Sequence, residues 1–276
     1  MKTALIQLNS GDMPSENLPV TQEFIAQAAG QDARFVLTPE VTNCVSASRA
    51  HQVAVLQTEA EDQTLAALRT QAEALGIWLL IGSLALKTGD ADGRFANRSF
   101  LIAPDGGIAA RYNKMHMFDV TVSETETYRE SKGYRPGDRA VLADISGVKV
   151  GLSICYDIRF PYLYRALAQG GAQVLTAPSA FSTATGPAHW EPLLKARAIE
   201  TGSFVLAPAQ TGRHAATTGK TRETYGHSLA ISPWGEILSD AGIEPGISLI
   251  SLDLSQVQAV RNSIPSLTHT RSFAGP

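Results

Sequence analysis

The feature that most constrains the fold of this chain is an alternation of short apolar runs with segments of helical spacing. Each run is rich in Val, Ile and Leu and predicts a strand. The runs are Ala4–Leu8, Phe35–Thr38, Ile77–Ile81, Ser99–Ala103, Val148–Ile154, Val174–Ala177, Phe204–Ala207, Ser228–Ile231 and Ile247–Leu252. Apolar residues at helical spacing lie between several of them, in Glu59–Leu75, Tyr162–Gly170 and Trp190–Thr201. The alternation predicts an α/β fold, because helices then cover the faces of the sheets.

Two short segments predict hairpins, so the sheet pairing is expected to be mixed. Ile102–Ile108 and Ile231–Ile237 each consist of an apolar residue, a turn containing proline and glycine, and a second apolar residue. No linker, repeat or low-complexity tract interrupts the pattern. We therefore expect one domain over residues 1–276, with an extended C-terminal arm from about residue 262.

Composition excludes several classes of protein. The formal charge is −3 and no basic cluster occurs, which argues against nucleic-acid binding. The most apolar stretch, Leu75–Leu86, is too short to span a bilayer. The first apolar run ends at Gln7 and Asn9, unlike a signal peptide. The two cysteines, Cys44 and Cys155, make no disulfide framework. We expect a soluble, reduced, cytoplasmic protein.

Two polar segments are long for connections inside a compact domain. Asp119–Arg139 and His214–Thr224 are of the kind that forms lids or binding loops. Gly219–Thr221 ends like a phosphate-binding loop, but histidine occupies the position of the first glycine, so we set this motif aside. Asn97–Ser99 matches the glycosylation pattern, which carries no weight without secretion.

A cysteine follows one of the predicted strands. Cys155 ends the run Val148–Ile154 and precedes a predicted helix. Ligands in open α/β sheets bind at the carboxyl ends of strands, and the N-terminal end of a helix favours the thiolate. Position alone also fits an inert cysteine, because free cysteines are among the most buried residues.

Two charged residues also follow predicted strands. Glu40 comes after Phe35–Thr38, where Pro39 cannot continue a central ladder, and Lys114 comes directly after the return strand of the first hairpin. Each alone is typical of a solvated surface charge. Together with Cys155 they offer a general base, a cation for a developing oxyanion and a nucleophile.

Several motifs together resemble one family. The motifs are Pro39–Glu40, Tyr112–Asp119, Gly151–Pro161, Thr185–Trp190, Lys195–Glu200 and Tyr225–Ser228. They resemble the nitrilase superfamily of carbon–nitrogen hydrolases over nearly the whole chain. Within it, Ala207–His214 is most similar to the branch that contains deaminated glutathione amidase and ω-amidase. The resemblance implies an αββα four-layer sandwich, no metal or organic cofactor, and a homodimer or higher homo-oligomer that pairs through the helical layer near Cys155.

The resemblance also implies roles for individual residues. Cys155 would attack an amide carbonyl, Glu40 would transfer the protons, and Lys114 with the backbone N–H of Tyr156 would stabilise the oxyanion. Arg159 would bind a substrate carboxylate, as in related carbamoyl amino-acid hydrolases, unless it forms a structural pair with Asp157 or a loop carbonyl.

A second glutamate is expected between Lys114 and the cysteine strand. Glu130 fits best, and Glu124 and Glu126 are alternatives.

The expected function is a cysteine-dependent amidase. It would cleave a small carboxylate-bearing amide, such as deaminated glutathione, to an acid and ammonia through a thioester. The alternatives are an ω-amidase acting on α-ketoglutaramate-like amides, an N-carbamoyl amino-acid hydrolase, and a catalytically silent binding subunit. A papain-like enzyme could use His116, His189 or His227, but papain-like signatures are missing. A metal hydrolase is disfavoured, since the chain lacks H-E-x-x-H.

Overall fold

Five strands from the first half of the chain and one from near the C-terminus build one six-stranded sheet. In the computed structural model, which describes residues 1–122 and 127–275, its strand order is β16-β1-β2-β3-β4-β5. The strands are β1 (Lys2–Gln7), β2 (Phe35–Leu37), β3 (Trp78–Lys87), β4 (Phe95–Ile102), β5 (Ile108–Asn113) and β16 (Gly246–Ser251). β1, β2 and β3 are parallel, whereas β16, β4 and β5 join by antiparallel pairing. β2, β3 and β5 therefore end at the same edge.

The second half builds a matching sheet. Its strand order is β15-β14-β11-β10-β9-β8, with β9, β10 and β11 parallel. The strands are β8 (Val141–Ile145), β9 (Val148–Leu152), β10 (Val174–Thr176), β11 (Phe204–Ala207), β14 (Leu229–Ile231) and β15 (Ile237–Asp240). A parallel bridge between Leu8 and Gln210 links the chain after β1 with the chain after β11. The carboxyl ends of both parallel sets therefore meet at one place.

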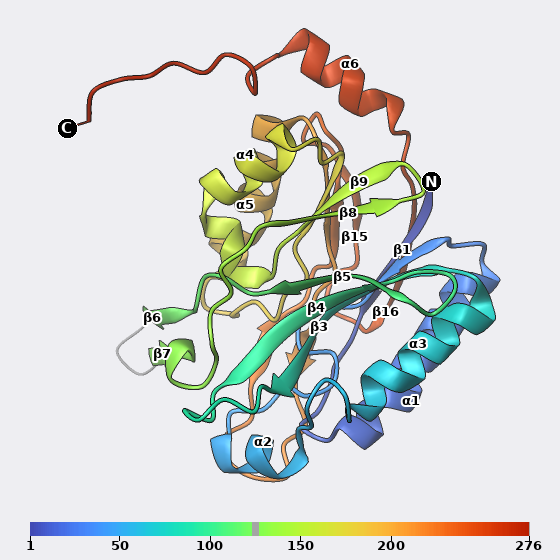
Figure 1. Ribbon diagram of the computed structural model, residues 1–276, viewed down its shortest axis with the longest axis vertical. Helices are drawn as coiled ribbons and strands as arrows, with labels where there is room; N and C mark the ends of the chain where they lie inside the picture. The colour runs from blue at the N-terminus through green and yellow to red at the C-terminus, as the bar shows by residue number, and fades with distance from the viewer. Residues whose placement is uncertain (123–126, 276) are drawn as a thin grey trace.

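Helices cover the outer face of each sheet. They are α1 (Pro14–Gly30) and α3 (Gln63–Leu75) on the first sheet, and α4 (Pro161–Gln169) and α5 (Gly186–Thr201) on the second. Figure 1 shows the two pairs on opposite sides of the strands. Alternation along β1 explains the layers: Leu5 packs between the sheets, whereas Ala4 and Ile6 pack under α1 and α3. The predicted αββα four-layer sandwich is confirmed.

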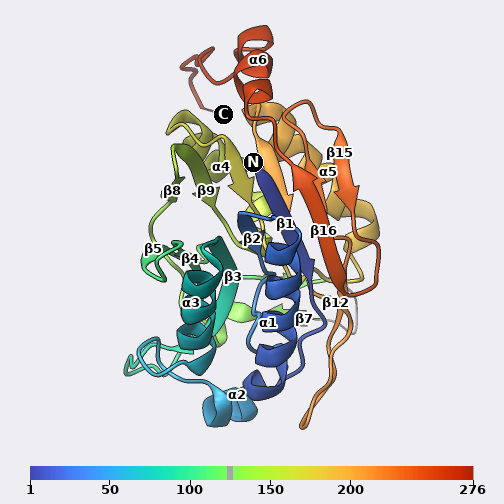
Figure 2. The ribbon, with the colours of Figure 1, turned by 90° about the vertical axis from the view of Figure 1, so that its right-hand side faces the viewer.

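Smaller elements extend beyond the sheets. They are α2 (Arg49–Val55), the hairpins β6 (Asp119–Thr121) with β7 (Thr127–Arg129) and β12 (Thr211–Arg213) with β13 (Glu223–Tyr225), the 3₁₀ helices η1 (Glu130–Lys132) and η2 (Cys155–Arg159), and α6 (Ser255–Ser263). The loop of the second hairpin, orange in Figure 2, reaches the level of α2. After α6 the chain passes α4, where the Arg165 guanidinium donates to the carbonyl of Ser266.

The structure contains the predicted strands and helices, with shifted ends. Both predicted hairpins are present as β4–β5 and β14–β15. α3 begins after Asp62, whose carboxylate accepts from the N–H of Leu65, rather than at Glu59. α1 was not predicted, because its buried face includes the polar residues Asn17 and Thr21. Among the described residues, no helix is long and apolar enough to cross a membrane.

Candidate active site

The strand ends from both sheets surround one cavity of about 740 Å³. Its inner part is lined by Glu40, Lys114, Glu130 and Cys155, which we call the inner group. Glu40 follows β2, Lys114 follows β5 and Cys155 follows β9. The parallel course of these strands within each sheet explains why residues so far apart in the sequence share a cavity.

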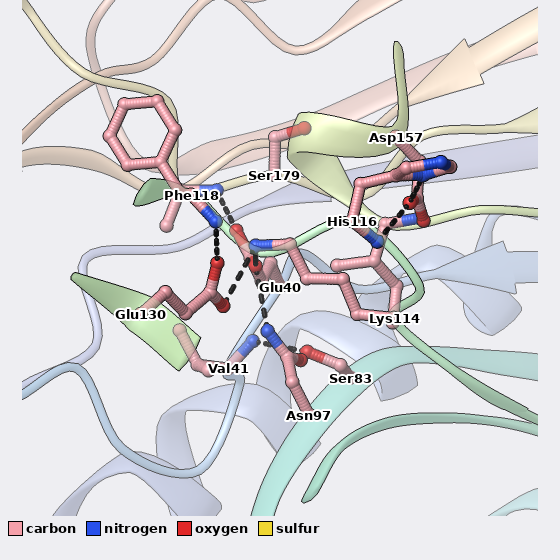
Figure 3. Close-up of polar contacts among 12 residues, drawn as sticks. Glu40, Val41, Ser83, Asn97, Lys114, His116, Phe118, Glu130, Asp157 and Ser179 are labelled. Atoms are coloured by element: carbon pink, nitrogen blue, oxygen red, sulfur yellow. Dashed lines mark hydrogen bonds and ion pairs between the residues drawn. The ribbon is translucent and has the colours of Figure 1, made fainter. Parts of the chain in front are cut away.

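The inner group is held together by short polar contacts. The Lys114 ammonium lies between two carboxylates, 2.9 Å from Oε1 of Glu40 and 2.9 Å from Oε1 of Glu130 (Figure 3). The other oxygen of Glu130 accepts from the N–H of Phe118 at 2.6 Å. Glu130 is therefore the second glutamate that reaches Lys114. Glu124 and Glu126, the sequence alternatives, lie outside the described residues.

Glu40 receives hydrogen bonds from both halves of the molecule. Its Oε1 accepts from Lys114 and from Nδ2 of Asn97 in β4 at 2.8 Å. Its Oε2 accepts from the N–H of Ala180, after β10, at 2.8 Å. The carbonyl of Pro178, in the same segment, accepts from the N–H of Cys155 at 3.0 Å. One stretch of the second sheet thus positions both the carboxylate and the thiol.

Close packing and strained backbone fix the segments that follow β2 and β9. A Cβ at Gly82 would lie 2.0 Å from the carbonyl oxygen of Thr38 and 2.5 Å from Cβ of Pro178, so only glycine fits there. Cys155 and Val41 have φ of +46° and +47°, a region that L-residues rarely adopt. The N–H of Val41 donates to the Ser83 hydroxyl at 2.7 Å. Backbone strain of this kind is characteristic of functional sites.

Burial and charge set the protonation states. Burial alone would raise the pKa of Glu40, but the Lys114 charge and the hydrogen bonds from Lys114, Ala180 and Asn97 hold that pKa below its ordinary value. Burial alone would lower the pKa of Lys114, but the carboxylates of Glu130 and Glu40 raise it well above the usual range. The cluster therefore holds two carboxylates and one ammonium.

The pKa of the Cys155 thiol shifts in the direction opposite to the sequence-based expectation. Burial, then the negative charge of Glu40, raises the pKa of Cys155; Lys114 opposes this rise, while hydrogen bonding to Glu40 and the charge of Glu130 add to it. A helix N-terminus was expected to favour the thiolate, but burial and two nearby carboxylates outweigh it. The resting thiol is neutral, and it needs a base.

Asp157 ties the cysteine strand to the lysine segment. This fully buried carboxylate accepts from the N–H of Ile154 at 2.9 Å and from the N–H of His116 at 3.0 Å. The Tyr112 hydroxyl donates to it at 2.6 Å, and the His116 ring contacts it at 2.6 Å (Figure 3). Sequence reasoning missed both Asp157 and Asn97 as parts of the site. A buried polar residue in the middle of the β4 strand pattern was the available signal for Asn97.

Of the two predicted substrate-binding residues, Tyr156 lies in the cavity lining and Arg159 does not. Tyr156 lines the cavity, and its amide lies in the first turn of η2, where helix N–H groups lack partners within the helix. Arg159 is not among the described residues that line the cavity, and its Nη2 lies 3.1 Å from Nδ1 of His189. Cys44 lines the cavity, and its thiol donates to the carbonyl of Asp12 at 3.3 Å.

The histidines do not complete a cysteine–histidine pair. His116 bonds to Asp157, His189 to Arg159 and His227 to Asp240. No histidine occurs among the described residues that line the cavity. The papain-like alternative therefore loses its base. Within residues 1–122 and 127–275, no three His, Cys, Asp or Glu residues are placed to hold a metal ion.

Comparison with known proteins agrees with this geometry. The model of the family described as carbon-nitrogen hydrolase matches residues 2–262. The chain belongs to the carbon–nitrogen hydrolase family. It is 40% identical over 270 residues to a deaminated glutathione amidase of Synechocystis sp., covering 96% of each chain. It is 36% identical over 271 residues to omega-amidase NIT2 of Homo sapiens, covering 98% of this chain and 95% of the relative.

A solved structure of the nitrilase superfamily has the same fold. Saccharomyces cerevisiae Nit3, described as a member of branch 10 of the superfamily, superimposes with a TM-score of 0.86. It is 29% identical and covers 99% of this chain and 97% of its own. This carbon–nitrogen hydrolase is therefore an enzyme that acts on carbon–nitrogen bonds other than peptide bonds, and the resemblance read from the sequence motifs is confirmed.

Proposed function

We propose that this carbon–nitrogen hydrolase is a cysteine amidase that acts through a Glu40–Lys114–Cys155 triad. Its substrate is a small carboxylate-bearing amide of the deaminated glutathione kind. The products are the acid and ammonia, or an amine where the amide nitrogen is substituted. The observation that carries the proposal is that all three triad residues line one cavity, with Lys114 bonded to Glu40.

The first chemical step forms a thioester. Oε1 of Glu40 accepts from Lys114 and Asn97, whereas Oε2 accepts from the N–H of Ala180, so Oε2 has room for the thiol proton. As Glu40 takes that proton, the Cys155 sulfur bonds to the amide carbon. Lys114 and the Tyr156 N–H stabilise the oxyanion, a contribution of about 3–4 kcal/mol for one well-placed donor. The protonated Glu40 then gives its proton to the nitrogen, and the C–N bond breaks.

The second step hydrolyses the thioester. Glu40 takes a proton from a water molecule, and the hydroxide oxygen attacks the thioester carbon. The C–S bond breaks as the carbonyl re-forms, and the proton on Glu40 returns to the Cys155 sulfur. The cluster of two carboxylates and one ammonium explains why the thiol keeps its proton until substrate is bound, since a thiolate would add a further negative charge.

Glu130 is proposed to hold Lys114 in place. It accepts from Lys114 with one oxygen and from the N–H of Phe118 with the other. Because Glu130 begins η1, directly after the β6–β7 hairpin, it also connects the lysine to the segment that borders the cavity.

An ω-amidase activity toward α-ketoglutaramate is the second candidate. The human relative named omega-amidase is nearly as similar to the chain as the Synechocystis relative. The cavity favours the first candidate, because its length reaches from the inner group to residues 220–223 of the β12–β13 hairpin. Deaminated glutathione is the longer substrate and carries a carboxylate at each end. An N-carbamoyl amino-acid hydrolase remains a third candidate, and Arg159, its expected carboxylate ligand, lies outside the cavity lining.

The decisive experiment compares two cysteine variants. Hydrolysis of deaminated glutathione is measured for the wild type, Cys155→Ala and Cys44→Ala. We expect Cys155→Ala to lose all detectable turnover while its stability changes by about 1–2 kcal/mol at most. Cys44→Ala is the matched control, because this second thiol lines the same cavity. Mass mapping of the acyl adduct should find Cys155. An adduct on Cys44, or turnover by Cys155→Ala, would refute the mechanism, and no turnover by the wild type would favour the silent subunit.

We further propose a cytoplasmic homodimer or higher homo-oligomer that pairs through the layer of α4 and α5, each subunit folding as one domain. Three large side chains on or beside this layer are well exposed: Tyr162, Ile199 and Trp234. Gly235, which follows Trp234 in the chain, packs against Ile199. Both cysteines are free, as suits a reducing compartment. Sedimentation of Ile199→Glu at a lower mass than the wild type would support pairing here.

A further inference from the structure

One arginine of the cavity differs from the other two, Arg49 and Arg129, in having no partner among the described residues. Arg222 is half-buried, and within residues 1–122 and 127–275 its guanidinium makes no hydrogen bond or ion pair. Arg49, by contrast, donates to the carbonyl of Gly133 and lies over the ring of Phe95. Arg129 donates to the carbonyls of Val120 and Tyr128. A half-buried cation without a partner has given up part of its hydration without compensation.

The backbone of Arg222 is held in place. Its carbonyl accepts from the N–H of His214 at 2.9 Å, which closes the hairpin loop. The His214 ring lies 2.8 Å from the Ser10 carbonyl oxygen and 2.7 Å from the Thr224 hydroxyl. Farther along the loop, Thr217 donates from its N–H and its hydroxyl to buried Asp12. The arginine thus projects from an anchored loop, and a ligand need not order that loop.

Arg222 lines the cavity together with Cys44 and Tyr134. Burial raises the pKa of Cys44 to about 12 and also raises that of Tyr134, and the charge of Arg222 opposes both rises. Both of these side chains line the cavity. The charge of Arg222 is therefore felt across the cavity wall.

Among the described residues, the lining of the cavity carries a positive surplus. Its charged lining residues are the cations Arg49, Lys114, Arg129, Lys132, Lys220 and Arg222 and the carboxylates Glu40, Glu130 and Glu223. The protein carries a formal charge of −3, so the cavity is opposite in sign to the whole molecule. Such a concentration of one sign raises the local concentration of oppositely charged ligands.

We propose that Arg222 binds a carboxylate of the substrate, with its guanidinium fork paired to both carboxylate oxygens and Lys220 adding positive charge nearby. Planar, bidentate pairing is the arrangement that arginine makes best with carboxylates. This assignment rests on the proposed amidase function. It replaces Arg159 in that role by a residue that the cavity contains.

The test uses three substrates and two arginine variants. Deaminated glutathione, its derivative with a glycyl carboxamide, and α-ketoglutaramate are compared for the wild type, Arg222→Met and Arg129→Met. We expect Arg222→Met to raise KM for deaminated glutathione about tenfold to a hundredfold, the range for a charged hydrogen bond, with kcat within about threefold. Arg129→Met removes the same charge from the same cavity and should raise KM less than about threefold.

The substrates distinguish which carboxylate Arg222 binds. If it binds the glycyl carboxylate, the carboxamide derivative already has a raised KM with the wild type and Arg222→Met adds little. If it binds the carboxylate of the acyl portion, Arg222→Met raises KM for all three substrates. Arg222→Lys should recover part of the loss. Unchanged KM values for all three substrates in Arg222→Met would overturn the proposal.

A binding measurement separates this proposal from the catalytic one. Calorimetry with deaminated glutathione, which carries both carboxylates and which a protein without Cys155 should bind without hydrolysing, is carried out on Cys155→Ala and on Cys155→Ala combined with Arg222→Met. Weaker binding to the double variant supports Arg222 even if none of the three amides is a substrate. Equal binding, or no binding to either protein, overturns the assignment. If Arg222→Met has no effect on KM although the wild type hydrolyses the amides, the proposed function survives and only this inference fails.

Discussion

The inner and outer parts of the cavity are built by opposite rules. In the inner group, Lys114 donates to Glu40 and Glu130, and each carboxylate also accepts from a backbone N–H. In the outer part, Lys132 and Lys220 are exposed and Arg222 has no partner among the described residues. The inner group is satisfied before substrate arrives, whereas the outer cations gain their partner from it. We therefore expect inner substitutions to change kcat and outer substitutions to change KM.

The largest effect is expected from the base. Glu40→Gln keeps the shape and an oxygen for the Ala180 N–H but cannot take the thiol proton, so kcat should fall about 10²–10⁴-fold. Glu223→Gln is the control, because this exposed carboxylate also lines the cavity. Its kcat should stay within about threefold of the wild type. Steady-state kinetics check both, and a Glu40→Gln enzyme with more than a tenth of wild-type kcat would erase the contrast between the two regions.

A smaller and more specific effect is expected from Asn97. Its Nδ2 bond helps to keep the pKa of Glu40 low, whereas its Oδ1 is buried without a partner among the described residues. Asn97→Leu removes the bond, so the pKa of Glu40 rises and the acid limb of the kcat/KM profile moves to higher pH. Asn97→Asp should move it further, because a second carboxylate raises that pKa more. Acid limbs that coincide with the wild type in both variants would show that Asn97 does not position the base.

The smallest effect is expected from Arg159. Its guanidinium bonds to His189 outside the cavity lining, so Arg159→Met should change kcat/KM for deaminated glutathione by less than about threefold. Its stability loss should lie within about 1 kcal/mol, as for a partly exposed contact. A hundredfold rise in KM here would instead transfer the carboxylate-binding role from Arg222 to Arg159.

The sequence predicted the inner part of the site better than the outer part. Glu40, Lys114 and Cys155 each follow a strand, and the end of a strand is a local pattern that a single sequence displays. Asn97 was missed because it lies inside a strand and reaches Glu40 only through sheet pairing. Arg222 was missed because its role depends on how the β12–β13 hairpin docks against Ser10 and Asp12.

The fold, too, was predicted from the sequence only in part. Apolar alternation predicted the sheets, and the family motifs predicted the four layers. α1 escaped prediction, since its inward face uses Asn17, which bonds to the backbone of Gly11 and Asn43 instead of packing as an apolar residue. The raised pKa of Cys155 was not predicted either, because it follows from burial and from the approach of Glu40 in space and not from the adjacent helix.

The donor that reaches Glu40 from the second sheet is a main-chain amide, that of Ala180. Exchanging the methyl group there for almost any other side chain leaves this donor untouched, and proline alone deletes it. A mutational scan based on alanine would therefore pass over residue 180, although its amide orients the proposed proton acceptor. The alignment of the two half-sites is in this respect encoded in the chain path and is largely protected from single amino-acid replacements.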